Sequence, residues 1–162
     1  MIHRAACFAM GTRFELVLDD ADPSRLGPIA EHVLEEITRW HDRLSLFKRD
    51  SFLSYINAHA PHTPVPLEPE LFDLFEICLG INRGSEGAFD PAVAPLMSAL
   101  GLHKDAIGAS QTGLERQGMS AVELDHDRRT IRFGSPGVVL DLGAVAKGFA
   151  LDMAAAHLRE FG

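Results

Sequence analysis

Residues 138–152 read VVLDLGAVAKGFALD, and their pattern changes from strand to helix without a linker. The apolar, β-branched start at residues 138–142 predicts a buried strand, and the alanine-rich remainder predicts a helix that begins near Ala144. This junction would place Asp141 at the end of the strand, with the first amides of the helix and the positive end of its dipole facing beyond it. We therefore expect the rest of the chain to be organised around this strand–helix corner.

The predicted corner carries the groups of an anion-binding site. Lys147 follows Ala144 by three residues, so its side chain can lie beside the start of the predicted helix. Gly143 and Gly148 leave space for a ligand or another backbone. The same residues also suit a purely structural corner, in which Asp141 caps the helix and Lys147 extends into solvent. From the residues alone, both interpretations stay open.

Length and composition predict one soluble globular domain over residues 1–162. The chain is 46% hydrophobic and 23% charged, which is typical of a domain with one sizeable core. Its formal net charge of -8 argues against a protein that binds nucleic acid through phosphate contacts. An acidic protein that binds an anionic cofactor needs a local positive group or a metal ion.

The start of the chain bears on its location. No stretch approaches the ~18 apolar residues of a membrane span, so a cytoplasmic location is expected for the chain as written. The triplet Ala5-Ala6-Cys7 is faintly like a lipoprotein cleavage site, although no apolar segment precedes it. A periplasmic, membrane-anchored location is the alternative if the true N-terminus carries a lipoprotein signal.

Cysteines and histidines give no metal-ligand pattern. Cys7 and Cys78 are far apart and belong to no CxxC pair, so neither a disulfide framework nor a zinc site is predicted. The eight histidines are scattered, and the nearest pair, His59 and His62, has no third ligand at the usual spacing.

Local patterns predict the remaining elements. A hairpin is expected over residues 5–19 with its turn at Gly11-Thr12, beside which Met10 is expected to fill the core. Apolar spacing predicts helices over about 26–40 and 69–84, and Ser51 is expected to cap a short helix to Asn57. The other expectations are a proline-rich loop ending at residue 66, a helix starting at residue 91 and capped by residue 90, an exposed connection over 103–118, and a second hairpin over 122–133.

Four motifs then appear in order along the chain. They are Met10-Gly11-Thr12, residues 44–47 leading to Ser51 and Asn57, residues 87–91 leading to Pro95, and residues 141–148 leading to Asp152. In order and spacing they resemble the ApbE family, the FAD:protein FMN transferases. The resemblance implies an α+β, T-fold-like architecture, an antiparallel sheet with packed helices, of which this chain forms the N-terminal part.

The family's activity supplies the functional expectation. Its members bind FAD, use Mg²⁺ to cleave the pyrophosphate, and transfer FMN to a Ser or Thr hydroxyl of an acceptor protein, typically a redox-complex subunit; some instead hydrolyse FAD to FMN and AMP. By motif, the resemblance implies that Ala144 binds the metal through its backbone carbonyl. It implies FAD contacts by Met10, Phe47, Ala88, Phe89, Asp90, Asp141 and Lys147, and Asp90 can also act as a helix cap.

The chain departs from the family pattern in several places. Phe47 stands where the family usually has Tyr, which keeps an aromatic ring but loses a hydroxyl, and Leu100-Gly101 replaces the usual Trp-Gly. Family members continue beyond this point, with a late Asp and Ser/Thr that complete the metal site, so no catalytic residue is assigned here. A truncated chain, a split gene or a short paralogue would each explain the difference, and a second chain or self-association could then complete the sheet.

Two other functional interpretations stay open. The first is a non-catalytic flavin-binding or assembly module on the same fold. The second is an unrelated α+β domain.

Overall fold

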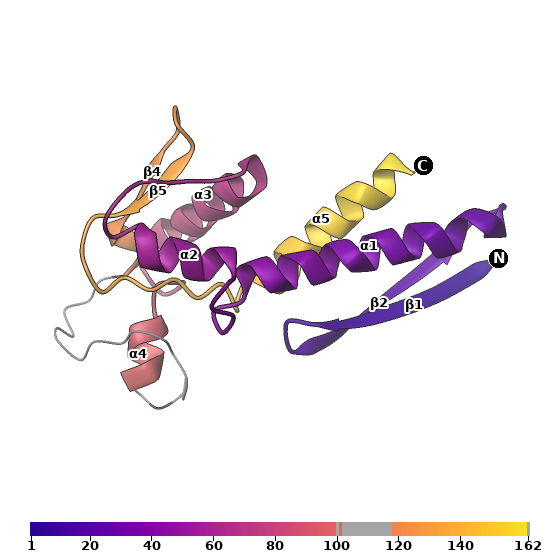
Figure 1. Cartoon of the computed structure of the whole chain (residues 1–162), viewed down its shortest axis with the longest axis horizontal. Helices are drawn as coiled ribbons and strands as arrows, with labels where there is room; N and C mark the ends of the chain where they lie inside the picture. Colours follow the sequence, from indigo (N-terminus) through magenta and orange to yellow (C-terminus); the bar gives the residue numbers. More distant parts are fainter. Residues whose placement is uncertain (100, 102–117, 162) are drawn as a thin grey trace. The chain divides into compact units, whose positions relative to one another are not determined.

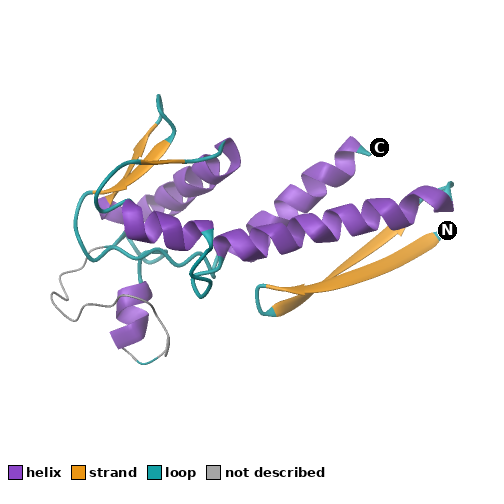
Figure 2. Ribbon diagram, in the orientation of Figure 1, coloured by secondary structure: helices purple, strands orange, loops and turns teal. Residues whose placement is uncertain are grey.

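The structure, a computed structural model, describes residues 1–99, 101 and 118–161, and it divides the chain into two compact units. Unit 1 consists of Met1–Ser45 and Gly143–Gly162, and unit 2 of Leu46–Leu142. Each unit combines helices with antiparallel strands, so the predicted α+β class is confirmed (Figures 1 and 2). Among the helices of the described residues, none has the length and apolar character needed to cross a bilayer.

Unit 1 begins with a two-stranded hairpin. Strand β1 (Ile2–Ala9) pairs antiparallel with β2 (Thr12–Asp19), and Ala9 lies opposite Thr12. The hairpin is therefore confirmed, but the predicted turn is wrong by one residue. Met10 and Gly11 form it, with φ angles of 51° and 70°, because a tight hairpin loop that matches the strand twist needs positive φ at both central residues.

A long helix lies against the hairpin. Helix α1 (Pro23–Leu44) begins after Asp22, whose carboxylate accepts hydrogen bonds from the Ser24 hydroxyl at 2.6 Å and the Ser24 amide at 3.0 Å. These bonds lower the pKa of Asp22, and the bond from the Ser24 hydroxyl has the larger effect. The helix also packs along α5 (Ala146–Glu160), as Figure 1 shows. The shared core comprises Ala9, Phe14, Val33, Ile37 and Ala154.

Unit 2 holds the remaining elements in chain order. They are α2 (Phe52–His59), β3 (Val65–Pro66), α3 (Pro69–Gly84), α4 (Ala94–Ala99), the 3₁₀ turn η1 (Met119–Ala121), β4 (Val122–Asp125) and β5 (Thr130–Phe133). The predicted helices over 69–84 and after Ser51 and the second hairpin are confirmed.

The proline-rich segment differs from the prediction at its end. Val65 and Pro66 form an edge strand opposite Ile131 and Thr130, giving the strand order β3-β5-β4. An edge strand tolerates proline because one side of it has no ladder to join. The segment was expected to be a loop throughout, and that expectation is wrong for these two residues.

The focal stretch also differs from its prediction. Residues 138–142 are not assigned as a strand, although their side chains alternate as a strand's would, with Val138, Leu140 and Leu142 buried. Residues 143–145 form a turn, and the helix begins at Ala146 rather than near Ala144. The predicted connection over 103–118 lies outside the described residues, except for its last residue.

Candidate functional site

The predicted contact residues fall into two groups, one in each unit. Unit 1 contains Met10, Ala144 and Lys147. Unit 2 contains Phe47, Ala88, Phe89, Asp90 and Asp141.

In unit 2, the end of α3 fixes the loop that carries residues 88–90. The Asn82 side-chain amide donates to the Phe89 carbonyl at 2.7 Å, and the Phe89 amide donates to the Ser85 hydroxyl at 3.0 Å. Glu86 and Gly87 turn the chain with φ angles of 52° and 80°. The loop thus has a defined backbone before it reaches Asp90.

Asp90 holds two neighbouring segments together. Its Oδ1 accepts hydrogen bonds from the Ala92 amide at 2.8 Å and the Met119 amide at 3.0 Å. A Cβ at Gly118 would collide with this carboxylate, so the close approach requires glycine there. The expected helix starting at Pro91 is wrong, because α4 begins at Ala94 and Asp90 caps a turn instead.

Three of the four motifs meet in unit 2. The Asn57 side chain accepts from the Leu140 amide at 2.9 Å and donates to the Leu140 carbonyl at 3.0 Å. The next residue, Asp141, donates its amide to the Pro91 carbonyl at 2.7 Å. The Asn57 side chain therefore pairs with the Leu140 backbone as a neighbouring strand could, and Asp141 lies beside the Asp90-Pro91 motif.

The two aromatic candidates of unit 2 differ in exposure. Phe47 is 61% exposed, so much of its surface is in contact with solvent. Phe89 is partly buried, and its backbone is fixed by the bonds described above.

In unit 1, Lys147 lies close to the turn that precedes α5. Its Nζ donates to the Gly143 carbonyl at 3.3 Å, so the side chain returns to the turn as the spacing predicts. Ala144 is exposed in the same turn. Val145 occupies the N-cap position and makes no side-chain capping bond, so the interpretation of Asp141 as the helix cap is wrong.

Met10 has the packing role expected of it. Its side chain packs against the core of unit 1, and its amide donates to Nδ1 of His41 at 3.1 Å. Nothing in this geometry tests a contact with flavin, which stays a prediction.

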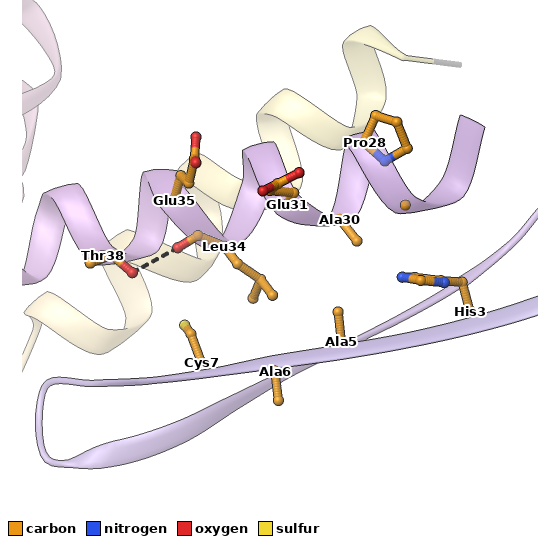
Figure 3. Close-up of a pocket in the computed structure, with 11 residues that line it drawn as sticks. His3, Ala5, Ala6, Cys7, Pro28, Ala30, Glu31, Leu34, Glu35 and Thr38 are labelled. Carbon is orange, nitrogen blue, oxygen red and sulfur yellow. Dashed lines mark hydrogen bonds between the residues drawn. The ribbon is translucent and has the colours of Figure 1, made fainter. Parts of the chain in front are cut away.

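A surface groove of about 770 Å³ lies between β1 and α1 (Figure 3). None of the predicted contact residues lines this groove. Two acidic residues of α1, Glu31 and Glu35, are among the residues that line it, and their negative charge would repel the phosphates of a nucleotide. The groove is therefore a poor candidate for the flavin nucleotide site.

Sequence reasoning missed several residues that shape these sites. The sequence motif includes Asn57 but gives no sign of the bonds it makes to Leu140, and nothing in the local pattern of Asn82 or Ser85 signals the bonds they make. The histidines that come together in the structure are also not the pair nearest in sequence. His59 stacks on Tyr55 with ring centroids 4.0 Å apart and donates to the Tyr55 carbonyl, whereas a different cluster of histidines forms in unit 1.

Comparison with known proteins identifies the family of the chain. The sequence profile of the ApbE family matches residues 10–162. The FAD:protein FMN transferase of Vibrio cholerae is 26% identical over 147 residues, which cover 88% of this chain and 43% of that protein. The enzyme of the same name from Rhodobacter capsulatus is 36% identical over 102 residues, covering 59% of this chain and 20% of that protein.

Solved structures show the same likeness. The ApbE protein of Thermotoga maritima superimposes with a TM-score of 0.83 at 28% identity, covering 99% of this chain and 53% of that one. The apo flavinyl transferase ApbE of Pseudomonas stutzeri gives a TM-score of 0.79 at 19% identity, which supports the fold alone, over 100% of this chain and 56% of that one. The matched part of the chain covers between 20% and 56% of each of these relatives. Since the family profile covers nearly all of its residues, the chain belongs to the ApbE family.

Proposed function

We propose that the protein containing this chain binds FAD and transfers its FMN half to a Ser or Thr hydroxyl of an acceptor protein. The observation that carries the proposal is the meeting of three motifs in unit 2, through the Asn57 bonds to Leu140 and the bond between Asp141 and Pro91. Residues that are far apart in sequence and share a family pattern are thereby held in one place. A structural corner alone would not require this meeting.

The proposed roles follow the chemistry of each group. Phe47 offers an exposed ring for stacking, and the loop carrying Ala88 and Phe89 offers a fixed backbone edge. Asp141 supplies a carboxylate for hydrogen-bonding to the nucleotide. Lys147 supplies the positive charge that a protein of net charge -8 needs near a pyrophosphate.

Asp90 has a supporting role in this scheme. Its Oδ1 already accepts two backbone amides, so its main effect is to position the loop that precedes it. Met10 similarly combines core packing with a proposed contact to the nucleotide.

The donor set of this chain fits a magnesium ion in part. Mg²⁺ prefers oxygen ligands and is usually held by a few protein groups together with water and substrate phosphates. The turn before α5 exposes Ala144, whose backbone carbonyl is such a ligand. When bound, the ion would neutralise charge on the pyrophosphate. A single carbonyl is not enough to hold it, so other protein oxygens, water or the phosphates would supply the remaining ligands.

The proposed reaction is a phosphoryl transfer. The acceptor hydroxyl oxygen forms a bond to the phosphorus of the FMN half, the bond from that phosphorus to the bridging oxygen breaks, AMP leaves, and the hydroxyl proton is released. In this step the chain's own residues would bind and orient FAD, and the Lys147 side chain would offset negative charge on the pyrophosphate.

Titration of the purified protein with FAD, followed by flavin fluorescence with and without Mg²⁺, tests the proposal. We expect Lys147→Ala and Asp141→Ala each to weaken binding at least tenfold. Arg159→Ala, at the other end of α5, and Asp127→Ala, on an exposed loop, are the matched controls and should bind like wild type. Equal affinities for all these variants would exclude the proposed site.

Product analysis then distinguishes the reactions open to the site. Transfer yields AMP and FMN bound covalently to protein, whereas hydrolysis yields AMP and free FMN. FAD binding without either product would favour the non-catalytic flavin-binding module.

A further inference from the structure

Three potential metal ligands meet where α1 packs on α5 in unit 1. His32 and Glu36 are four residues apart on α1 and so lie on one face of that helix, while His157 reaches them from α5. One ligand atom from each residue lies within 4.8 Å of the others. Neither the sequence motifs nor the proposed flavin chemistry uses this cluster.

Glu36 is the buried member of the cluster. Its side chain is 6% exposed, and its Oε1 accepts from Arg39 Nη2 at 2.6 Å and from Trp40 Nε1 at 3.1 Å. These bonds fix the orientation of the carboxylate and leave Oε2 directed at α5, where His157 lies. Outer bonds of this kind are what hold a metal-binding carboxylate in place.

His157 has a buried ring nitrogen that faces Glu36. Its Nδ1 is buried and lies 2.6 Å from Glu36 Oε2, yet among the described residues it makes no hydrogen bond of acceptable geometry. A buried polar atom without a hydrogen bond is costly. A metal ion bound by both Nδ1 and Oε2 would take the place of the missing hydrogen bond, because each atom would donate a lone pair to the ion.

His32 completes the set from an exposed position. Its ring lies edge-on to that of His157, with centroids 5.3 Å apart. Ligands at ~2.0–2.1 Å from a tetrahedral ion are about 3.3 Å from one another. Nδ1 of His157 and Oε2 of Glu36 would therefore move apart from 2.6 Å, while the wider separations within the 4.8 Å cluster would contract. Because His32 is exposed, a change of its side-chain rotamer can provide that contraction.

We propose that His32, Glu36 and His157 bind a divalent transition metal of the zinc class, with water in the fourth position. Two imidazole nitrogens and one carboxylate are typical zinc ligands, whereas Mg²⁺ prefers sites made only of oxygen. The ion would link α1 to α5, the helix that carries Lys147 in its first turn. Its effect on the flavin site is therefore indirect, through the stability of unit 1.

Metal titration of the protein, stripped with a chelator and kept in excess Mg²⁺ to occupy oxygen sites, tests this proposal. We expect Zn²⁺ to bind in a 1:1 ratio and Co²⁺ to give the strong visible absorption of a four-coordinate site. His157→Ala and His32→Ala should each weaken Zn²⁺ binding at least tenfold. His62→Ala, an exposed histidine in unit 2, is the control and should bind like wild type.

The variants also guard against loss of folding. His32 is exposed, so His32→Ala should unfold like wild type in the presence of chelator, and its loss of affinity then reports ligation. If wild type binds no Zn²⁺, the contact between Glu36 and His157 is only a structural link between α1 and α5, and the proposal is wrong. Zn²⁺ binding that both histidine variants retain, or that His62→Ala weakens equally, would also overturn it.

Discussion

Replacing Asn57 with alanine tests whether a single side chain holds the segment that leads to Asp141. In the structure the side-chain amide of Asn57 forms hydrogen bonds with both the backbone N–H and the backbone carbonyl of Leu140, a residue with no exposed surface. Asn57→Ala removes both partners at once. The Leu140 backbone then loses the hydrogen bonds that a neighbouring strand would otherwise supply.

The expected cost follows from these two bonds. Leaving one buried backbone group without its partner costs about 1–3 kcal/mol, which gives about 2–6 kcal/mol for the pair. Alanine is the better helix former by ~0.6 kcal/mol, which offsets a little of this loss. Asn57 is only partly buried, so water can reach the site, and we expect a net destabilisation near the lower half of the range, about 2–4 kcal/mol.

Urea unfolding measures this change, and hydrogen exchange of the Leu140 amide locates it. Ala58→Asn is a matched control, since it places asparagine at the next, exposed position of α2 and measures helix propensity alone. Asn57→Asp keeps the acceptor for the Leu140 amide but loses the donor to the Leu140 carbonyl, so its unfolding free energy should lie between those of wild type and Asn57→Ala. A loss below 0.5 kcal/mol beyond the control, with unchanged exchange at Leu140, would refute the reasoning.

Three further predictions concern unit 2. Gly118→Ala should cost about 1–3 kcal/mol in urea unfolding because its methyl group displaces the Asp90 carboxylate, whereas Gly80→Ala, in open space on α3, should stabilise by about 0.5–1 kcal/mol. Ser51→Ala should lower the unfolding free energy by ~1 kcal/mol, since the Ser51 hydroxyl caps α2; an unchanged midpoint would contradict this role. Burial raises the pKa of the Cys78 thiol from its ordinary 9.0 to about 11. The contribution of the protonated thiol to the unfolding free energy should therefore be complete below pH 9 and lost as the pH rises through 11. Thiol reagents should modify Cys78 at pH 8 only after the protein unfolds.

Local patterns were sufficient wherever an element is defined by its own residues. The apolar spacing of α1 and α3 and the alternation in both hairpins gave the correct elements, because a helix or a hairpin satisfies most of its backbone groups within itself. The predicted cap at Ser51 likewise acts on an amide three residues away.

The errors occur where the partner is distant in sequence. Residues 138–142 have the burial of a strand, yet their partners are the Asn57 side chain and the Pro91 carbonyl. Pro66 was placed in a loop because its pairing with Thr130 is not visible locally. The four-residue spacing of His32 and Glu36 was available as a signal, but it gains meaning only from His157 on another helix.

The sequence by itself determined the class of elements, the cap at Ser51, and, through its ordered motifs, membership of the ApbE family. Short-range hydrogen bonds and side-chain periodicity carry that information along the chain. Tertiary structure alone decided that Asn57 holds Leu140, that Asp90 braces a turn rather than a helix, and that two histidines and a buried carboxylate converge between α1 and α5. These contacts depend on how residues separated by tens of positions pack together, which no local pattern encodes.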